Sequence, residues 1–288
     1  MKFKYLIIAF SIIIVIVIFI TIFVPSQLSA GGFTDSLNSG EANVLSVVNF
    51  RYITFPLLAF MALLLVLMSL YFIINYRLLS LLEKEDWPAL AFYLEQQIYE
   101  KDRYSDRNVR LLASSYLVIS DFKSVIRLEN KVHLAKPSVI GRNALIFGAA
   151  RILNGNHQEA VSFYKSYLEK CKKSDKEWVF WFSGFSELLA GLYPAAEADF
   201  SRMAVSSRDA LISGLSAYFL NNYIEKKSFT SEKCRHDCNT GRERVLKSLK
   251  TAAGWKKEVK KAGNDIHMAI IKKHIEEAGN WIFSAVLT

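Results

Sequence analysis

The chain has 288 residues and a formal net charge of +9, because 36 lysines and arginines stand against 27 aspartates and glutamates. Its three cysteines are few and odd in number, which argues against a disulfide-framed scaffold. The basic balance suits an anionic membrane leaflet, an acidic protein or nucleic acid, and charge alone does not choose among these partners.

The first predicted element is an apolar segment near the N-terminus. No charged residue lies between Lys4 and Asp35, and residues 5–24 are long enough to cross about 30 Å of hydrocarbon. A cleaved signal peptide is the alternative. We favour an uncleaved helix, because the apolar core exceeds the usual length of about 7–15 residues and Leu28 spoils a cleavage site ending at Ala30.

A second uncharged stretch covers residues 52–76 and is bounded by Arg51 and Arg77. Its apolar core, residues 55–74, is again long enough to span a bilayer. We therefore expect residues 1–76 to form a transmembrane hairpin, with spans at 5–24 and 53–76 joined by a loop at 25–52.

The distribution of cations predicts the orientation of this hairpin. Lys2 and Lys4 precede the first span, Arg77 and Lys84 follow the second, and the loop holds only Arg51. Because positive charge stays on the inner side, both termini are expected in the cytoplasm, with the chain in a bacterial-type inner membrane.

The region after the spans contains similar segments at intervals of 35, 35 and 36 residues. An aromatic or histidine column is formed by Trp87, Phe122, His157 and Tyr193. Small residues recur at Ala113, Gly148 and Gly184, where two antiparallel helices would need to cross closely. A further column in the second helix of each pair holds Leu90, Ala160 and Ala196.

The residues between these columns are typical of helix ends. Gly155 and Gly191 tolerate the backbone angles that end a helix. Pro88 and Pro194 occupy matching places in the first turn of the next helix, where a missing N–H is harmless. The period and these residue types together predict stacked helical hairpins.

This pattern resembles the tetratricopeptide repeat over roughly residues 85–220. It departs from that family in lacking the first-helix tryptophan, and Arg151 and Glu187 stand where the family usually has an aromatic residue. The resemblance implies an all-α solenoid, over residues 77–225, that binds a protein on a concave face. The alternative is an irregular all-α domain with coincidental spacing.

The remaining segment, residues 226–288, is basic. Residues 226–240 are polar and predict a loop or linker, followed by helices at 242–261 and 265–286 that could cap the solenoid. Cys234 and Cys238 could share one face of a helix, but no second tight ligand pair accompanies them. We therefore expect free thiols and neither a metal nor a cofactor.

The sequence shows no phosphate-binding glycine loop, metalloprotease motif or nucleophile elbow, so we expect no enzyme. The predicted function is a membrane-anchored scaffold that binds a protein partner within a secretion, envelope or motility assembly. The alternative is a membrane-tethered binder of anionic lipid or nucleic acid through the basic C-terminal helices, of which nucleic acid is the less favoured ligand.

We expect the partner to contact the first helices of the hairpins, around residues 107–118, 142–152 and 178–188. Arginine and tryptophan are enriched at binding hot spots. The predicted contact residues are Arg107, Arg110, Arg142, Arg151, Trp178 and Trp181. Such a positive, partly aromatic groove would suit an acidic helix or tail. The competing interpretation buries the two tryptophans in the core.

Overall fold

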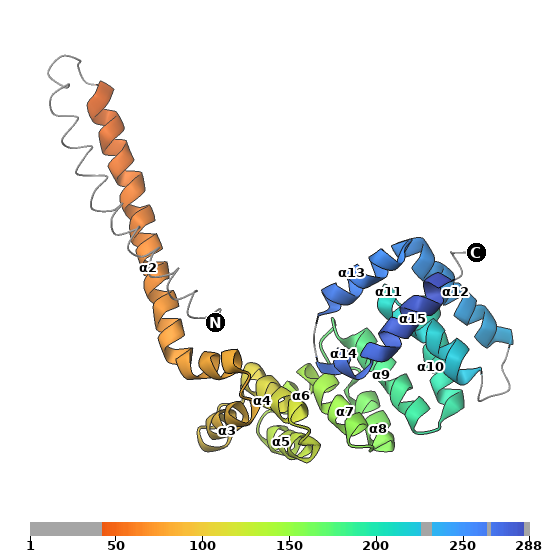
Figure 1. The fold of residues 1–288 in the computed structure, drawn as a ribbon. Helices are drawn as coiled ribbons and strands as arrows, with labels where there is room; N and C mark the ends of the chain where they lie inside the picture. The colour runs from red at the N-terminus through yellow and green to blue at the C-terminus, as the bar shows by residue number, and fades with distance from the viewer. Residues whose placement is uncertain (1–41, 226–231, 264–265, 285–288) are drawn as a thin grey trace. The chain divides into compact units, whose positions relative to one another are not determined.

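The computed structural model describes residues 42–225, 232–263 and 266–284. Throughout these ranges the regular structure is helical, with no strand, so the predicted all-α class is confirmed for them. The chain divides into two compact units, residues 1–90 and 91–288. Figure 1 shows the helices of each unit.

The first unit contains the helix α2, Ala42–Lys84, so residues 42–52 of the predicted loop are helical and belong to the same helix as the apolar section. Its section Ala59–Lys84 is long and apolar enough to cross a membrane, with a mean hydropathy of 2.1 over an 18-residue window. Large apolar side chains there are exposed, including Ile73 and Ile74 at 72% and 68%. Asn75 donates to the Tyr71 carbonyl of its own helix, which satisfies a polar group without water. The structure thus supports one candidate span, by length and composition, and the predicted span at 5–24 lies outside the described residues.

The remaining helices run in chain order from the end of the first unit to the C-terminal region. They are α3 Trp87–Glu95, η1 Gln96–Glu100 (a π-helical turn), α4 Asp106–Val118, α5 Phe122–Ala135, α6 Ser138–Arg142, α7 Ala144–Leu153, α8 His157–Tyr167, α9 Lys176–Leu189, α10 Tyr193–Ser206, α11 Ala210–Phe219, η2 Leu220–Ile224 (also π-helical), α12 Glu232–Leu249, α13 Ala252–Ala262, α14 Ile266–Ile270 and α15 Lys272–Ser284.

Four equivalent turns separate paired helices at the predicted spacing. The residue at the centre of each turn adopts a left-handed backbone: Glu85 (φ 54°), Ser120 (φ 61°), Gly155 (φ 78°) and Gly191 (φ 76°). In each turn the next N–H donates to a carbonyl five residues earlier, namely Asp86 to Leu81, Asp121 to Tyr116, Asn156 to Arg151 and Leu192 to Glu187, over 2.8–3.2 Å. This pattern satisfies carbonyls that the helix end leaves open. The sequence repeat therefore corresponds to a repeated helix–turn–helix geometry.

The repeated side chains occupy equivalent places. The column of Trp87, Phe122, His157 and Tyr193 forms the first residue of α3, α5, α8 and α10, and each is half-buried. No exposed surface remains on Leu90, Ala113, Ala160 or Ala196. Gly148 faces the ring of Tyr164, and a Cβ on Gly184 would lie 3.1 Å from Cβ of Asp199. The small residues thus sit where helices approach closely.

The aromatic stretch of α9 lies in the core of the second unit. Trp181 and Phe182 have no exposed surface, and Phe185 is 5% exposed. The Trp181 ring packs against Phe200 of α10 and Phe219 of α11, with ring centroids 5.8 and 5.4 Å apart. The competing interpretation, in which Trp181 is a core residue, therefore describes its position.

The C-terminal segment differs from the expected loop and two long helices. Residues 232–240 belong to α12, which packs on α11 and buries Cys234 and Cys238. Its buried stripe includes Cys234, Cys238, Gly241 and Val245, which follow one another at intervals of three or four residues. Sequence reasoning missed this stripe because cysteine and glycine are weakly apolar signals.

The predicted helix at 242–261 is broken after Leu249. Lys250 adopts a positive φ of 59°, and the Thr251 hydroxyl then caps α13 by accepting from the Gly254 N–H at 3.2 Å. The predicted helix at 265–286 is likewise divided into α14 and α15. Here α14 packs on α7 and α15 on α11, so the C-terminal helices cover part of the first-helix side of the hairpins (Figure 1).

Two carboxylates meet between α9 and α10, Glu187 of α9 and Asp199 of α10. Glu187 is 1% exposed and pairs with Lys165 at 2.5 Å. Burial and then the charge of Glu187 raise the pKa of Asp199 to about 6. Because the folded pKa exceeds the unfolded value near 4, this group stabilises the fold at low pH. That contribution is lost as the pH rises through about 6.

Asp199→Asn is therefore expected to raise the melting temperature at pH 7.5 and to leave it nearly unchanged at pH 4. The uncharged amide avoids the repulsion from Glu187 at neutral pH. Thermal melts of the full chain in detergent between pH 4 and 8 measure this, with the exposed Glu276→Gln as control. A benefit that is equally large at pH 4 would contradict the explanation.

Candidate partner-binding cavity

The second unit contains a cavity of about 830 Å³ on the first-helix side of its hairpins. Residues of α4, α6, α7, α9 and α11 line one side, and residues of α12, α13 and α14 line the other. The cavity therefore exists only because the C-terminal helices fold back over the repeated hairpins.

Asp106, the first residue of α4, organises one end of this region. Its carboxylate accepts from the Asn143 amide at 2.7 Å and lies 3.6 Å from both the Arg142 guanidinium and the Lys172 ammonium. Asn143 also donates to the Val139 carbonyl at 2.9 Å, which fixes its orientation. These contacts hold two cationic side chains of the cavity lining in place.

Polar contacts between α9 and the start of α11 organise the other end. The Ser207 hydroxyl donates to Glu177 at 2.6 Å, and Arg244 of α12 donates to the Ser207 carbonyl at 2.8 Å. Asp209 caps α11 by accepting from the Leu211 N–H at 2.8 Å. Burial raises the pKa of Asp209. The carboxylates here are engaged by groups of the same chain.

The C-terminal helices supply the remaining lining. His267 of α14 lies beside Trp178, with ring centroids 6.0 Å apart, and Met268 lines the cavity next to it. From α13, Glu258 and Lys261 form an ion pair at 3.4 Å. Trp178 is half-buried, so it offers the cavity an aromatic surface while its other contacts lie in the core.

The charge of the lining is nearly balanced. Its cations are Arg110, Arg142, Lys172, Arg208 and Lys261, and its anions are Asp175, Glu177, Asp209 and Glu258. Asp175 accepts from the Ser174 hydroxyl at 2.8 Å, so each of the four anions has a contact within the chain. The exposed Arg208 makes no ion pair within the described residues. The cavity is therefore less positive than the groove expected from the sequence.

The structure brings together three of the predicted contact residues. Arg110, Arg142 and Trp178 all line the cavity, while Arg107 is exposed on α4 and is absent from the lining. Trp181 is fully buried, so it has no surface to offer a partner in this conformation.

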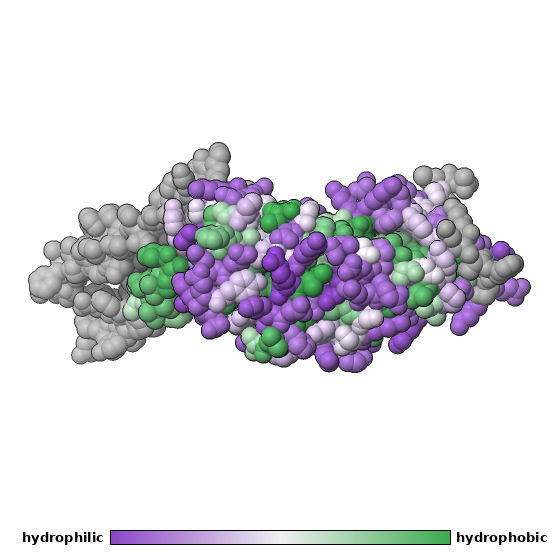
Figure 2. Space-filling view, turned by 90° about the horizontal axis from the view of Figure 1, so that it is seen from below, coloured by the Kyte–Doolittle hydropathy of each residue, from purple (hydrophilic) through white to green (hydrophobic). Residues whose placement is uncertain are grey.

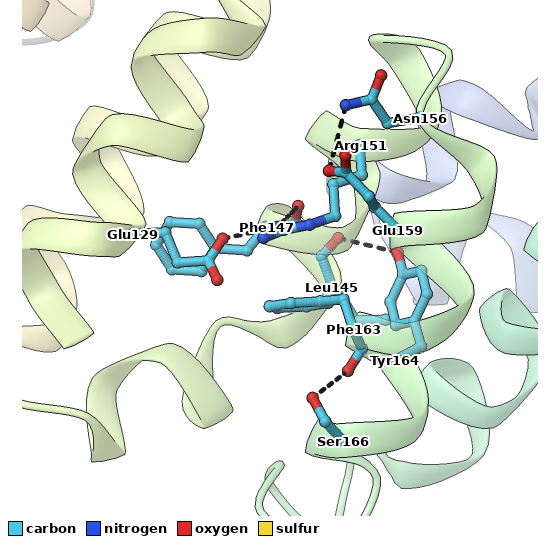
Figure 3. Close-up of polar contacts among 9 residues, drawn as sticks. All are labelled: Glu129, Leu145, Phe147, Arg151, Asn156, Glu159, Phe163, Tyr164 and Ser166. Carbon is cyan, nitrogen blue, oxygen red and sulfur yellow. Dashed lines mark hydrogen bonds and ion pairs between the residues drawn. The ribbon is translucent and has the colours of Figure 1, made fainter.

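Arg151 lies elsewhere, in a separate cavity formed with residues of α5 and α8. Figure 3 shows its contact with Glu129. Its guanidinium forms an ion pair with Glu129 at 2.6 Å, donates to the Phe147 carbonyl at 3.1 Å and lies 4.3 Å from the ring centre of Phe163. Both charged side chains are about nine-tenths buried, at 12% and 10% exposure. The pair joins successive hairpins, and Arg151 is engaged in the fold.

Sequence reasoning missed several residues of the cavity. Arg208, Lys172 and His267 lie in loops or in the C-terminal segment, outside the repeated positions. Asp209 could have been found, because aspartate just before an apolar run is a helix-start signal. The packing of α13 and α14 against the hairpins could not have been predicted, because these helices lie outside the periodic pattern of the repeats.

A family model described as "Uncharacterised Treponema protein" matches residues 124–284, which is more than half of the chain. The chain belongs to this Treponema protein family. A protein of Treponema pallidum (strain Nichols) is 28% identical to it over 235 residues, covering 78% of this chain and 74% of the relative. No solved structure matches the chain.

The match to the Treponema family extends from α5 to the end of α15. It includes every lining residue of the cavity except Arg110. The candidate membrane span lies before it. The cavity is thus a feature of the part of the chain that defines the family.

Proposed function

We propose that this chain is a membrane-anchored scaffold whose hairpins form a tetratricopeptide-like solenoid and bind a protein partner. The observation that carries the proposal is the continuity of α2. One helix, α2, contains the apolar section Ala59–Lys84 and ends at Lys84, next to Glu85 in the first of the four equivalent turns. Anchor and repeat array share a helix, so the repeats start where the apolar section stops.

The proposed partner segment enters the cavity and carries at least one acidic side chain. Arg208 is exposed and makes no ion pair within the described residues, and both Arg208 and the exposed Arg110 line the cavity. Trp178, His267 and Met268 add aromatic and apolar surface. A mixed lining of this kind suits a peptide segment, because arginine and tryptophan combine charge with large contact area.

We further propose that the chain spans the inner membrane twice, with both termini in the cytoplasm. The cations that flank the apolar segments support this topology. The second unit then faces the cytoplasm, where a membrane complex would assemble. Its free cysteines are consistent with a reducing compartment.

We expect the full chain to remain in alkaline-washed membranes and to be crosslinked there to a partner. Arg110→Glu combined with Arg208→Glu should reduce recovery of the partner by about tenfold or more, since truncating an arginine hot spot commonly costs about 2 kcal/mol. The readout is quantitative mass spectrometry after crosslinking and pull-down.

Lys123→Glu combined with Lys136→Glu is the matched control, because both lysines are exposed on α5 and its end and lie outside the cavity. Recovery should be unchanged by the control. Equal losses from the two double variants would reject the cavity as the binding site, and release of the chain by alkali would reject the anchor.

A further inference from the structure

The helix α13 presents an exposed cluster of lysines. Four of its eleven residues are lysine, and all four are exposed: Lys256, Lys257, Lys260 and Lys261. Its one acidic residue, Glu258, pairs with Lys261. The other three lysines form no ion pair within the described residues. Lys247 near the end of α12 and Lys250 just after it are also exposed and precede the cluster along the chain. We call these five lysines, without Lys261, the lysine face.

The opposite side of α13 is fixed in the fold by Trp255. This side chain is 4% exposed, and its indole N–H donates to the Ile275 carbonyl at 3.2 Å. It lies against Gly214 of α11 and Gly279 of α15, where an added Cβ would come within 2.7 and 2.6 Å of the ring. No larger residue fits at either glycine without movement, so Trp255 sets the direction in which α13 faces.

Helical geometry then places the lysines together. At about 100° per residue, the lysines of α13 lie within an arc of about 140°, and Trp255 lies outside that arc. Lys256 and Lys260, like Lys257 and Lys261, are four residues apart, a spacing at which like charges repel. Within α13, only Lys261 has an ion pair, with Glu258, that offsets this repulsion. An external anion would relieve it.

We propose that the lysine face binds the anionic lipid headgroups of the membrane in which the chain is anchored. The inference rests on the proposed anchor, which holds the second unit near a bilayer and so raises the local concentration of headgroups. Each lysine near an anionic leaflet adds to the attraction, which is screened beyond about 8–10 Å at ordinary salt.

The composition of α13 favours lipid over nucleic acid. Its exposed residues are lysine and alanine, with neither an aromatic ring nor an arginine among them. Single strands are held largely by stacking of bases on aromatic side chains, and the planar guanidinium is the group best suited to recognise bases. Lysine supplies a compact point charge, which is sufficient for a headgroup array.

The test compares lysine accessibility in nanodiscs. The full chain is incorporated into phosphatidylcholine discs with and without phosphatidylglycerol, and amine labelling is measured by peptide mass spectrometry. Labelling of Lys256, Lys257 and Lys260 should fall about tenfold in the anionic discs and recover at high salt. The exposed Lys123 of α5 is the internal reference and should be unaffected.

A triple variant, Lys256→Glu with Lys257→Glu and Lys260→Glu, provides the second measurement. These side chains are exposed, so the circular dichroism spectrum and melting temperature should match the parent. Lys250 should lose its protection in anionic discs, because the attraction of the neighbouring charges is reversed. Retained protection of Lys250 would overturn the proposal.

Equal labelling in the two kinds of disc would also overturn it. Protection in neutral discs by added single-stranded RNA, but not by anionic lipid, would assign the lysine face to nucleic acid instead. If the chain fails to enter discs, the anchor is rejected, and flotation of the chain with phosphatidylglycerol vesicles then decides the lysine face separately. Failure to float would reject it too.

Discussion

Gly148→Leu is expected to lower the melting temperature of the full chain by about 5 °C or more. The position of a Cβ at Gly148 is already occupied by the ring of Tyr164, whose side chain is fully buried. Overpacking of this kind costs about 1–3 kcal/mol, and 1 kcal/mol shifts a domain of this size by about 2–4 °C. Thermal melts followed by circular dichroism in detergent give the value.

Gln158→Leu is the matched control, because it places the same side chain at an exposed position of the neighbouring helix α8 and should shift the melt little. Tyr164→Leu combined with Gly148→Ala should lower the melting temperature by less than the sum of the two single changes, because leucine in place of Tyr164 vacates the space that the new Cβ needs. Additive losses would show that Gly148 and Tyr164 do not share that space. Gly184→Leu should lower the melting temperature less than Gly148→Leu, because a Cβ at Gly184 would lie 3.1 Å from its nearest neighbour, Cβ of Asp199.

The hairpins could be predicted because their determinants are local. A left-handed backbone is needed at each turn, and glycine at Gly155 and Gly191 signals it directly. Ser120 and Glu85 meet the same requirement without glycine, and only the spacing of the repeat identifies them. Away from the hydrophobic block that borders the grey atoms, the face drawn in Figure 2 has hydrophilic and hydrophobic residues interspersed.

The cavity could not be predicted in the same way, because tertiary contacts create it. The cluster of cations expected on the first helices is divided: Arg110 and Arg142 line the cavity, while Arg151 pairs with Glu129 in another place. The C-terminal helices add both charges and walls, through Lys261 and His267 among others. Sequence spacing places residues on one face of a helix, but it does not tell which face a later helix will cover.

The position of Glu129 explains why Arg151 is held in the fold. Glu129 occupies the repeated place taken by Leu94, Tyr164 and Phe200, at the same spacing of 35, 35 and 36 residues. Those three residues are at most 1% exposed, so this place belongs to the core. A carboxylate there needs a partner, because an unpaired buried charge is costly. Arg151, in the place that the tetratricopeptide resemblance gives to an aromatic residue, supplies that partner.

We therefore expect Arg151→Met to destabilise the full chain by about 3–5 kcal/mol, since it leaves the buried Glu129 carboxylate without its cation. Arg151→Met combined with Glu129→Leu should recover most of this loss, because the double variant restores the apolar residue of the other repeats. Melts of both variants and of Glu129→Leu complete the cycle. Lys176→Met is the control, because its ion pair with Glu169 is exposed and should contribute less than about 1 kcal/mol. A double variant as unstable as the sum of the single ones would mean that the two side chains act independently, and that the pairing of Glu129 with Arg151 does not hold these hairpins together.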